Sequence, residues 1–162
     1  MSVINTLVPV IVGGAIGVLG AIAGPPLTHW LNKEADRKKK QAEKLEELID
    51  AIFAYDHWLT DLQNRLVFGI STVVTQSPLS KVVALIAIHF PQFSLVSAEF
   101  EYEAKKYVVW MSDKSQKRVA GRPPSEWIEG HQEQYSAYAD KREAVLDKIK
   151  GYAKSELSTT KP

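Results

Sequence analysis

The segment that most constrains this chain is its first thirty-two residues, which contain no Asp, Glu, Lys or Arg. Within it, residues 7–27 form an almost unbroken apolar stretch. The residues from Leu7 to Gly24 would span roughly 27 Å as a helix, close to the hydrocarbon thickness of about 30 Å in a bilayer. We therefore expect residues 1–32 to form a transmembrane anchor that crosses the bilayer once.

Basic residues directly after this segment predict its orientation, because Lys and Arg near a span are retained on the cytoplasmic side. No charged side chain precedes the segment. We expect an inner (plasma) membrane protein with its N-terminus outside and its C-terminal domain in the cytoplasm. Residues 33–44 are expected to form the basic start of a helix next to the membrane. Five basic residues in it would contact anionic lipid headgroups. These residues are Lys33, Arg37, Lys38, Lys39 and Lys40.

A cleaved secretory signal is the alternative interpretation of the same segment. Ala21-Ile22-Ala23 resembles the small-residue site at which such signals are cut. The absence of a basic residue before the apolar stretch, the pair Pro25-Pro26 and the basic run that follows all disfavour it. The chain also has no cysteine, which agrees with a cytoplasmic domain.

Small residues recur on one face of the predicted span. At about 100° per residue, Gly13, Gly17, Gly20 and Gly24 fall within a narrow stripe, and Ala21 lies at its edge. In lipid, helices associate through close backbone approach, which glycine permits. This glycine seam predicts packing against a second copy, and therefore a homo-oligomer.

Beyond the anchor, apolar residues follow a helical period. They recur at steps of three and four from Leu45 to Leu66, with Phe53 on the buried side and an interruption at Tyr55 and Asp56. Ser77-Pro78 is typical of a helix start, and Phe90-Pro91 of a helix end. Residues 66–90 could instead form a second membrane hairpin, but Pro78 and Lys81 break the apolar length that a span requires.

Two further helices are expected in the C-terminal half. One covers residues 92–111, and a long polar connection then runs from Asp113 to Pro124. Ser125 is expected to cap a last helix, whose inward side chains would include Ile128 and Tyr138. No segment alternates with period two for long enough to predict a sheet.

The sequence thus predicts an all-α protein in which one N-terminal transmembrane helix precedes a cytosolic up-down helical bundle of about four helices. The bundle would occupy residues 45–157, followed by a disordered tail at residues 158–162.

A second basic cluster lies far from the anchor, in residues 105–122. A flexible basic loop beside a helix start is a candidate site for an anion such as the phosphate of a nucleotide-type ligand. A solvated loop or a lipid contact would explain the same charges. The cluster comprises Lys105, Lys106, Lys114, Lys117, Arg118 and Arg122.

Catalytic patterns are scarce. Without cysteine, thiol nucleophiles and zinc-thiolate sites are excluded, and no glycine-rich loop with a following Lys-Ser/Thr is present. Asp56-His57 with Asp61 could hold a metal or transfer a proton, although such spacing more often reflects a polar helix face. We expect no enzyme activity, no cofactor, no metal site and no binding to duplex nucleic acid.

These features together predict a protein that acts by association at the membrane, as a scaffold or as a membrane-perturbing effector. The layout of a short anchor and a small helical domain resembles that of membrane-bound effectors in bacterial stress response or antiviral defence, with no motif that assigns a family. The alternative is a membrane-bound sensor whose cytosolic domain binds a phosphorylated ligand such as a cyclic nucleotide.

Overall fold

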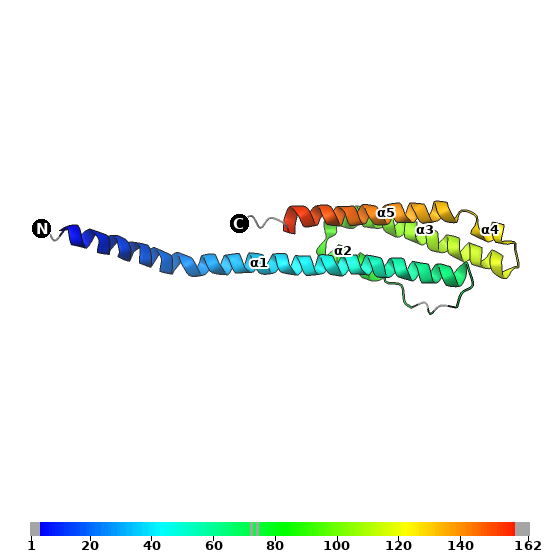
Figure 1. Cartoon of the computed structure of the whole chain (residues 1–162), viewed down its shortest axis with the longest axis horizontal. Helices are drawn as coiled ribbons and strands as arrows, with labels where there is room; N and C mark the ends of the chain where they lie inside the picture. Colours follow the sequence, from blue (N-terminus) through cyan, green and yellow to red (C-terminus); the bar gives the residue numbers. More distant parts are fainter. Residues whose placement is uncertain (1–3, 72, 74, 158–162) are drawn as a thin grey trace. The chain divides into compact units, whose positions relative to one another are not determined.

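The computed structural model describes the backbone of residues 4–71, 73 and 75–157, and the side chains within these ranges from residue 32 onward. The described backbone is helical and contains no strand, which confirms the all-α prediction (Figure 1). The α-helices are α1 (Ile4–Leu66), α2 (Leu79–His89), α3 (Ser94–Val119), α4 (Pro124–Ile128) and α5 (His131–Tyr152). The short helices are the 3₁₀ turn η1 (Pro91–Phe93) and the π-helical turn η2 (Ala153–Leu157).

The chain forms two compact units, residues 1–41 and residues 42–162. We call the second unit the bundle. Within the described residues, no helix combines the length and the apolar character needed to cross a membrane. The predicted span at residues 7–27 and its glycine seam lie outside the residues whose side chains are described, so both stay predictions.

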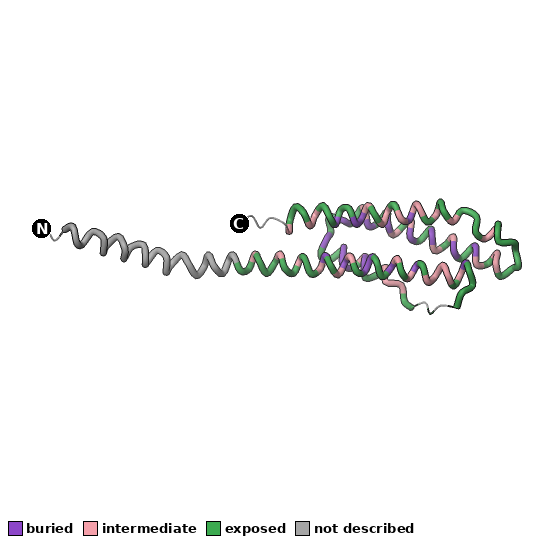
Figure 2. Tube along the Cα trace, in the orientation of Figure 1, coloured by how far each residue is buried: buried purple, intermediate pink, exposed green. Residues whose placement is uncertain are grey.

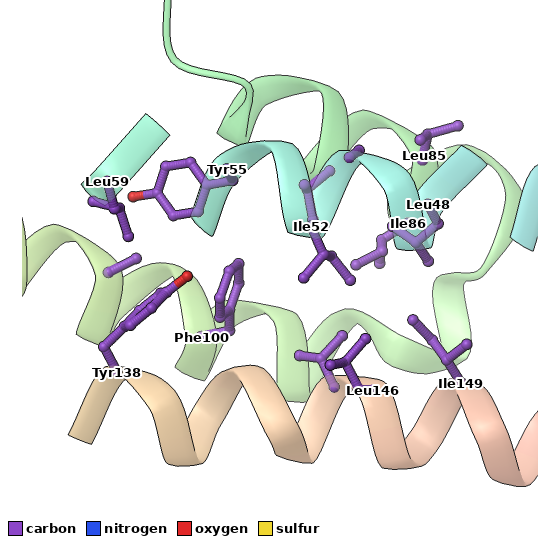
Figure 3. Packing of buried hydrophobic residues seen from close by; sticks show 14 of the residues in the cluster. Leu48, Ile52, Tyr55, Leu59, Leu85, Ile86, Phe100, Tyr138, Leu146 and Ile149 are labelled. Carbon is purple, nitrogen blue, oxygen red and sulfur yellow. The ribbon is translucent and has the colours of Figure 1, made fainter. Parts of the chain in front are cut away.

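The core of the bundle lies between α1, α2, α3 and α5, and the buried positions recur along each of these helices (Figure 2). Figure 3 shows how side chains from the four helices meet in one layer. Burial of such a side chain stabilises the fold by about 1.5–3 kcal/mol, which makes this layer the main source of stability. Its labelled members are Leu48, Ile52, Tyr55, Leu59, Leu85, Ile86, Phe100, Tyr138, Leu146 and Ile149.

Polar contacts give the directions of the helices. α1 and α5 are antiparallel, because Asp56 pairs with Arg142 while the later Gln63 contacts the earlier His131. α3 and α5 are also antiparallel, since Glu99 pairs with Lys141 while Trp110 donates a hydrogen bond to the carbonyl of Glu129. Neighbouring helices in opposite directions are the arrangement of an up-down bundle.

The first amphipathic helix differs in detail from the predicted pattern. Leu45, Leu48, Ile52 and Leu59 are buried as expected, but Phe53 is exposed. Tyr55, where the apolar pattern is interrupted, is buried instead and stacks on Trp58 with ring centroids 5.6 Å apart. An aromatic ring with a polar tip fits a core position that a strict apolar pattern assigns to the surface.

The predicted polar connection from Asp113 to Pro124 is wrong over its first half, because α3 continues to Val119. An ion pair one helical turn apart stabilises the last turns of α3, since Lys117 Nζ lies 3.1 Å from Asp113 Oδ2. The helix stops where Gly121 adopts a φ of 73° and Arg122 N–H donates to the carbonyl of Lys117. This glycine C-cap was the readable signal for the helix end.

The predicted last helix from Ser125 is also wrong, because it is split into α4 and α5. Gly130 separates them with a φ of 79°, a conformation that glycine adopts without strain. Ile128, expected in the core, is exposed on α4. The boundaries of α2 match the prediction closely: it begins directly after Pro78, where Ser77 Oγ accepts from the N–H of Leu79 at 3.4 Å, and ends at His89.

Candidate functional site

The six cations of the second basic cluster do not converge on one site. Lys105 and Lys106 lie in the middle of α3 and form ion pairs with acidic residues on the same helix. The Nζ to carboxylate distances are 2.7 Å to Glu101 and 2.8 Å to Glu103. These are exposed pairs one helical turn apart, which neutralise each other locally.

Lys114 is buried, although the sequence placed it in an exposed loop. Its Nζ donates a hydrogen bond to the carbonyl of Glu126 at 3.1 Å and lies 5.9 Å from the ring centre of Trp110. The buried ammonium therefore connects α3 to α4. Its aliphatic stem packs while its charge finds a backbone acceptor and an aromatic face.

The other three cations lie near the end of α3. Arg118 Nε donates to the carbonyl of Leu66 at 3.2 Å, which ties the end of α1 to the end of α3. Lys117 pairs with Asp113, and Arg122 lies 3.8 Å from Glu126. Each of these cations has an acceptor within the chain, so the predicted site for a phosphorylated ligand gains no supporting geometry and stays a prediction.

The basic residues that follow the predicted span lie on α1. Lys33, Arg37, Lys39 and Lys40 are exposed, Lys38 is half-buried, and Arg37 pairs with Glu34 at 2.9 Å. Their expected contact with lipid headgroups also stays a prediction. The glycine seam, with Gly13, Gly17, Gly20, Ala21 and Gly24, lies outside the described side chains.

The sequence pair Asp56-His57 splits between two faces of α1. His57 has 81% of its side chain exposed and lies 3.6 Å from Asp61. Asp56 turns toward α5, where its Oδ1 accepts hydrogen bonds from Arg142 at 2.7 Å and Tyr138 at 3.1 Å. Among the described residues, no three His, Asp or Glu side chains gather as a metal site would require.

The Asp56–Arg142–Tyr138 network is a contact that the sequence did not indicate. Burial lowers the pKa of Arg142, but the adjacent Asp56 carboxylate outweighs burial and raises the pKa overall. Hydrogen bonds from the two terminal nitrogens of Arg142 reach Asp56 and Glu143, while its buried Nε has no partner among the described residues. A charge-assisted hydrogen bond such as the one to Asp56 joins two helices. The network therefore serves the packing of α1 against α5.

One face of α3 is exposed along the whole helix. Leu95, Tyr102 and Val109 lie seven residues apart on it and are among the most exposed large apolar residues of the described chain. We call these three residues the α3 seam. The core face of α3 is offset from it around the helix, at Phe100, Ala104, Tyr107 and Met111.

A second group of exposed apolar side chains lies on segments near the end of the bundle that holds α4, whose backbone Figure 1 shows. Three segments form it: the connection between α1 and α2, the end of α3, and α4. The connection touches α4, because the rings of Phe68 and Trp127 lie 6.4 Å apart, centroid to centroid. The end of α3 is tied to the start of the connection, because Arg118 Nε donates to the carbonyl of Leu66. We call this surface the apolar end and define it by Phe68, Ile70, Val73, Val119 and Ile128, all exposed.

At the opposite end of the bundle, an open groove of about 720 Å³ lies between the start of α3 and the end of α5. Phe93, Leu95 and Tyr152 are among its apolar walls, while Glu99 and Lys148 contribute charge. The chain matches no protein-family model, no curated protein and no solved structure.

Proposed function

We propose that this chain is a single-pass, membrane-anchored helical protein that acts by association of its own copies at the inner membrane. The observation that carries the proposal is the α3 seam, a row of exposed apolar side chains on a helix whose other face is already packed. Tyr102, at its centre, has 63% of its surface exposed. Apolar rows of this length on a rigid helix are typical of interfaces.

The spacing of the seam supports a helix as its partner. Residues seven apart lie on the same side of a helix after two turns, which is the repeat with which two α-helices pack along their length. Leu95, Tyr102 and Val109 keep this repeat over the first two thirds of α3. The same row on a second copy supplies a matching surface.

Charges beside the seam favour a parallel arrangement of the two copies. Glu101 and Lys106 flank the row on opposite sides and are five residues apart. In a parallel pair of helices, positions with this offset face each other across the interface. Glu101 of one copy would therefore lie beside Lys106 of the other, twice by symmetry.

Mass measurement of the full-length protein in lipid nanodiscs tests the proposal. We expect an oligomer, and we expect Tyr102→Glu with Val109→Glu to shift it toward monomer, because a buried unpaired charge opposes association. Ile88→Glu is the matched control, since Ile88 is exposed on α2 and is not part of the seam. A monomer for the unaltered protein would contradict the proposal.

The glycine seam is tested separately by Gly13→Leu with Gly17→Leu in the same nanodiscs. If the glycine variant loses the oligomer while the variant Tyr102→Glu with Val109→Glu keeps it, association is assigned to the anchor. Loss in both variants would mean that the two surfaces cooperate. An unchanged mass in the glycine variant would contradict a role for that seam.

Cross-linking can give the direction of the pair. The chain has no cysteine, so a single introduced thiol reports without background. Leu95→Cys is expected to form a disulfide-linked dimer on mild oxidation, since position 95 faces itself in the parallel pair. Cross-linking of Leu95→Cys to Val109→Cys in a mixture, with none between two copies of position 95, would indicate the antiparallel pair instead.

A further inference from the structure

We propose that the apolar end of the bundle is a binding surface for anionic lipid bilayers. Five of the eleven large apolar side chains that are exposed in the described part of the chain lie in the three segments of this end. The proposal concerns the bundle alone and is independent of the α3 seam and of the predicted anchor.

The apolar side chains of this end come from the loop and helix ends, not from a helix face. Val73 has 88% of its surface exposed, and Ile70 and Phe68 precede it in the same connection. Ile128 lies on α4, next to the half-buried Trp127. Protruding apolar side chains beside an aromatic ring are typical of surfaces that enter the interfacial layer of a bilayer.

Hydrogen bonds hold these segments in place. Arg118 Nε donates to the carbonyl of Leu66 directly before the connection, and Trp58 Nε1 donates to the carbonyl of Thr75 near its other end at 2.8 Å. Lys114 fixes α4 through the carbonyl of Glu126. These contacts tie the two sides of the connection to α3 and α1, and they tie α4 to α3.

The charge of this end differs from that of the rest of the bundle. Residues 65–76 and 113–129 together hold five basic residues and three acidic ones. Residues 42–64 of α1, in contrast, hold one basic residue and six acidic ones. An anionic surface therefore attracts the apolar end and repels residues 42–64, which orients the bundle with this end toward the lipid.

The same charge argues against a second copy as the occupant. Two apolar ends in contact would bring like excess charge together, which opposes a symmetric pair. A bilayer supplies both the negative charge and the apolar phase that the exposed side chains require. We therefore assign an anionic bilayer to this surface.

The test uses an environment-sensitive dye on single cysteines in the full-length protein, held in nanodiscs. Val73→Cys reports on the apolar end, and Ile88→Cys reports on the opposite end as a matched control. Nanodiscs and added vesicles consist of phosphatidylcholine, with or without phosphatidylglycerol. We expect a blue shift at position 73 with the anionic lipid, little shift with the neutral lipid, and none at position 88.

Charge reversal separates the basic residues from the apolar ones. Lys117→Glu with Arg122→Glu should weaken the response at position 73 by about tenfold or more, since each basic residue near an anionic surface contributes about 1 kcal/mol. Lys148→Glu with Lys150→Glu, on α5 at the other end, is the matched control and should leave the response unchanged. Ile70→Ser should weaken the response without changing its dependence on salt.

Several outcomes would overturn the proposal. An equal shift at positions 73 and 88, or equal shifts with neutral and anionic lipid, would show that this end is not selective. A shift that appears when protein concentration rises without anionic lipid would assign the surface to a second copy. A full shift with polyglutamate alone would assign it to an acidic polymer.

Discussion

Two faces of α3 carry apolar residues, yet one face is buried and the other is exposed. Phe100 and Tyr107 on one face are buried among α1 and α5, whereas Tyr102 and Val109 on the other are exposed. Buried positions recur at steps of three and four residues, whereas the residues of the seam recur at steps of seven. The neighbouring helices cover the first face and leave the second face exposed.

The difference separates stability from association. A side chain on the core face makes dispersion contacts in every folded molecule, and its removal leaves a cavity. A side chain of the α3 seam is surrounded by water unless a partner covers it. Substitutions on the core face should therefore lower the free energy of unfolding, whereas substitutions in the seam should reduce the amount of oligomer.

The largest effect is expected for Phe100→Ala. Phe100 is buried against Tyr55 and Tyr138, with ring centroids 5.9 Å and 5.7 Å away. Its truncation should lower the free energy of unfolding by about 3–5 kcal/mol, measured by urea denaturation followed by circular dichroism. A loss of less than about 1 kcal/mol would contradict the packing of this face.

Alkaline pH should have the next largest effect. Burial raises the pKa of the Tyr55, Tyr107 and Tyr138 phenols above the ordinary value of 10. Because the folded state holds the phenolic proton more tightly than the unfolded state does, the contribution of each tyrosine to the free energy of unfolding is fully present below that ordinary value. The contribution is lost as pH rises above that value toward the raised pKa. Between about pH 10 and about pH 11, each tyrosine should lower the free energy of unfolding by about 1 kcal/mol.

Urea denaturation over this pH range checks the alkaline prediction. Tyr55→Phe is the informative comparison, because the Tyr55 hydroxyl has no hydrogen-bond partner among the described residues and its pKa is raised chiefly by burial, so the substitution mainly removes its ionisation. The variant should lose less stability above pH 10 than the unaltered protein. Identical pH profiles would show that Tyr55 does not contribute.

A smaller effect is expected for Asp56→Ala. The substitution leaves Arg142 and Tyr138 without their shared acceptor, and we expect a loss of about 2 kcal/mol in the free energy of unfolding. Asp50→Ala, an exposed acidic position on the same helix, should change it by less than about 0.5 kcal/mol. Equal losses in the two variants would mean that the network does not stabilise the bundle.

The smallest effect on stability is expected for Tyr102→Ala, although it lies two residues from Phe100. We expect a change of less than about 0.5 kcal/mol in a dilute, monomeric sample. Native mass spectrometry of the same variant in nanodiscs should nevertheless show less oligomer. A large loss of stability in the monomer would mean that the seam packs within the chain.

The helical class and much of the core could be predicted because they depend on local spacing. Leu48, Ile52 and Leu59 follow the helical period, and Phe90-Pro91 marks a boundary through the backbone restriction that proline imposes. The end of α3 was missed because Asp113 and Lys117 lack apolar periodicity, even though Gly121 carried a readable stop signal. The burial of Lys114 had no sequence signal.

By itself, the sequence determined that the described chain is helical and where proline and glycine interrupt it, since these depend on neighbours along the chain. It also predicted the charge-free anchor and glycine seam, which the described side chains do not reach. Only the tertiary structure decided that the cations of residues 105–122 are separated, that Asp56 reaches Arg142, and that the α3 seam is exposed. These outcomes depend on which helix faces pack together, and residues up to 86 positions apart in the chain make those contacts.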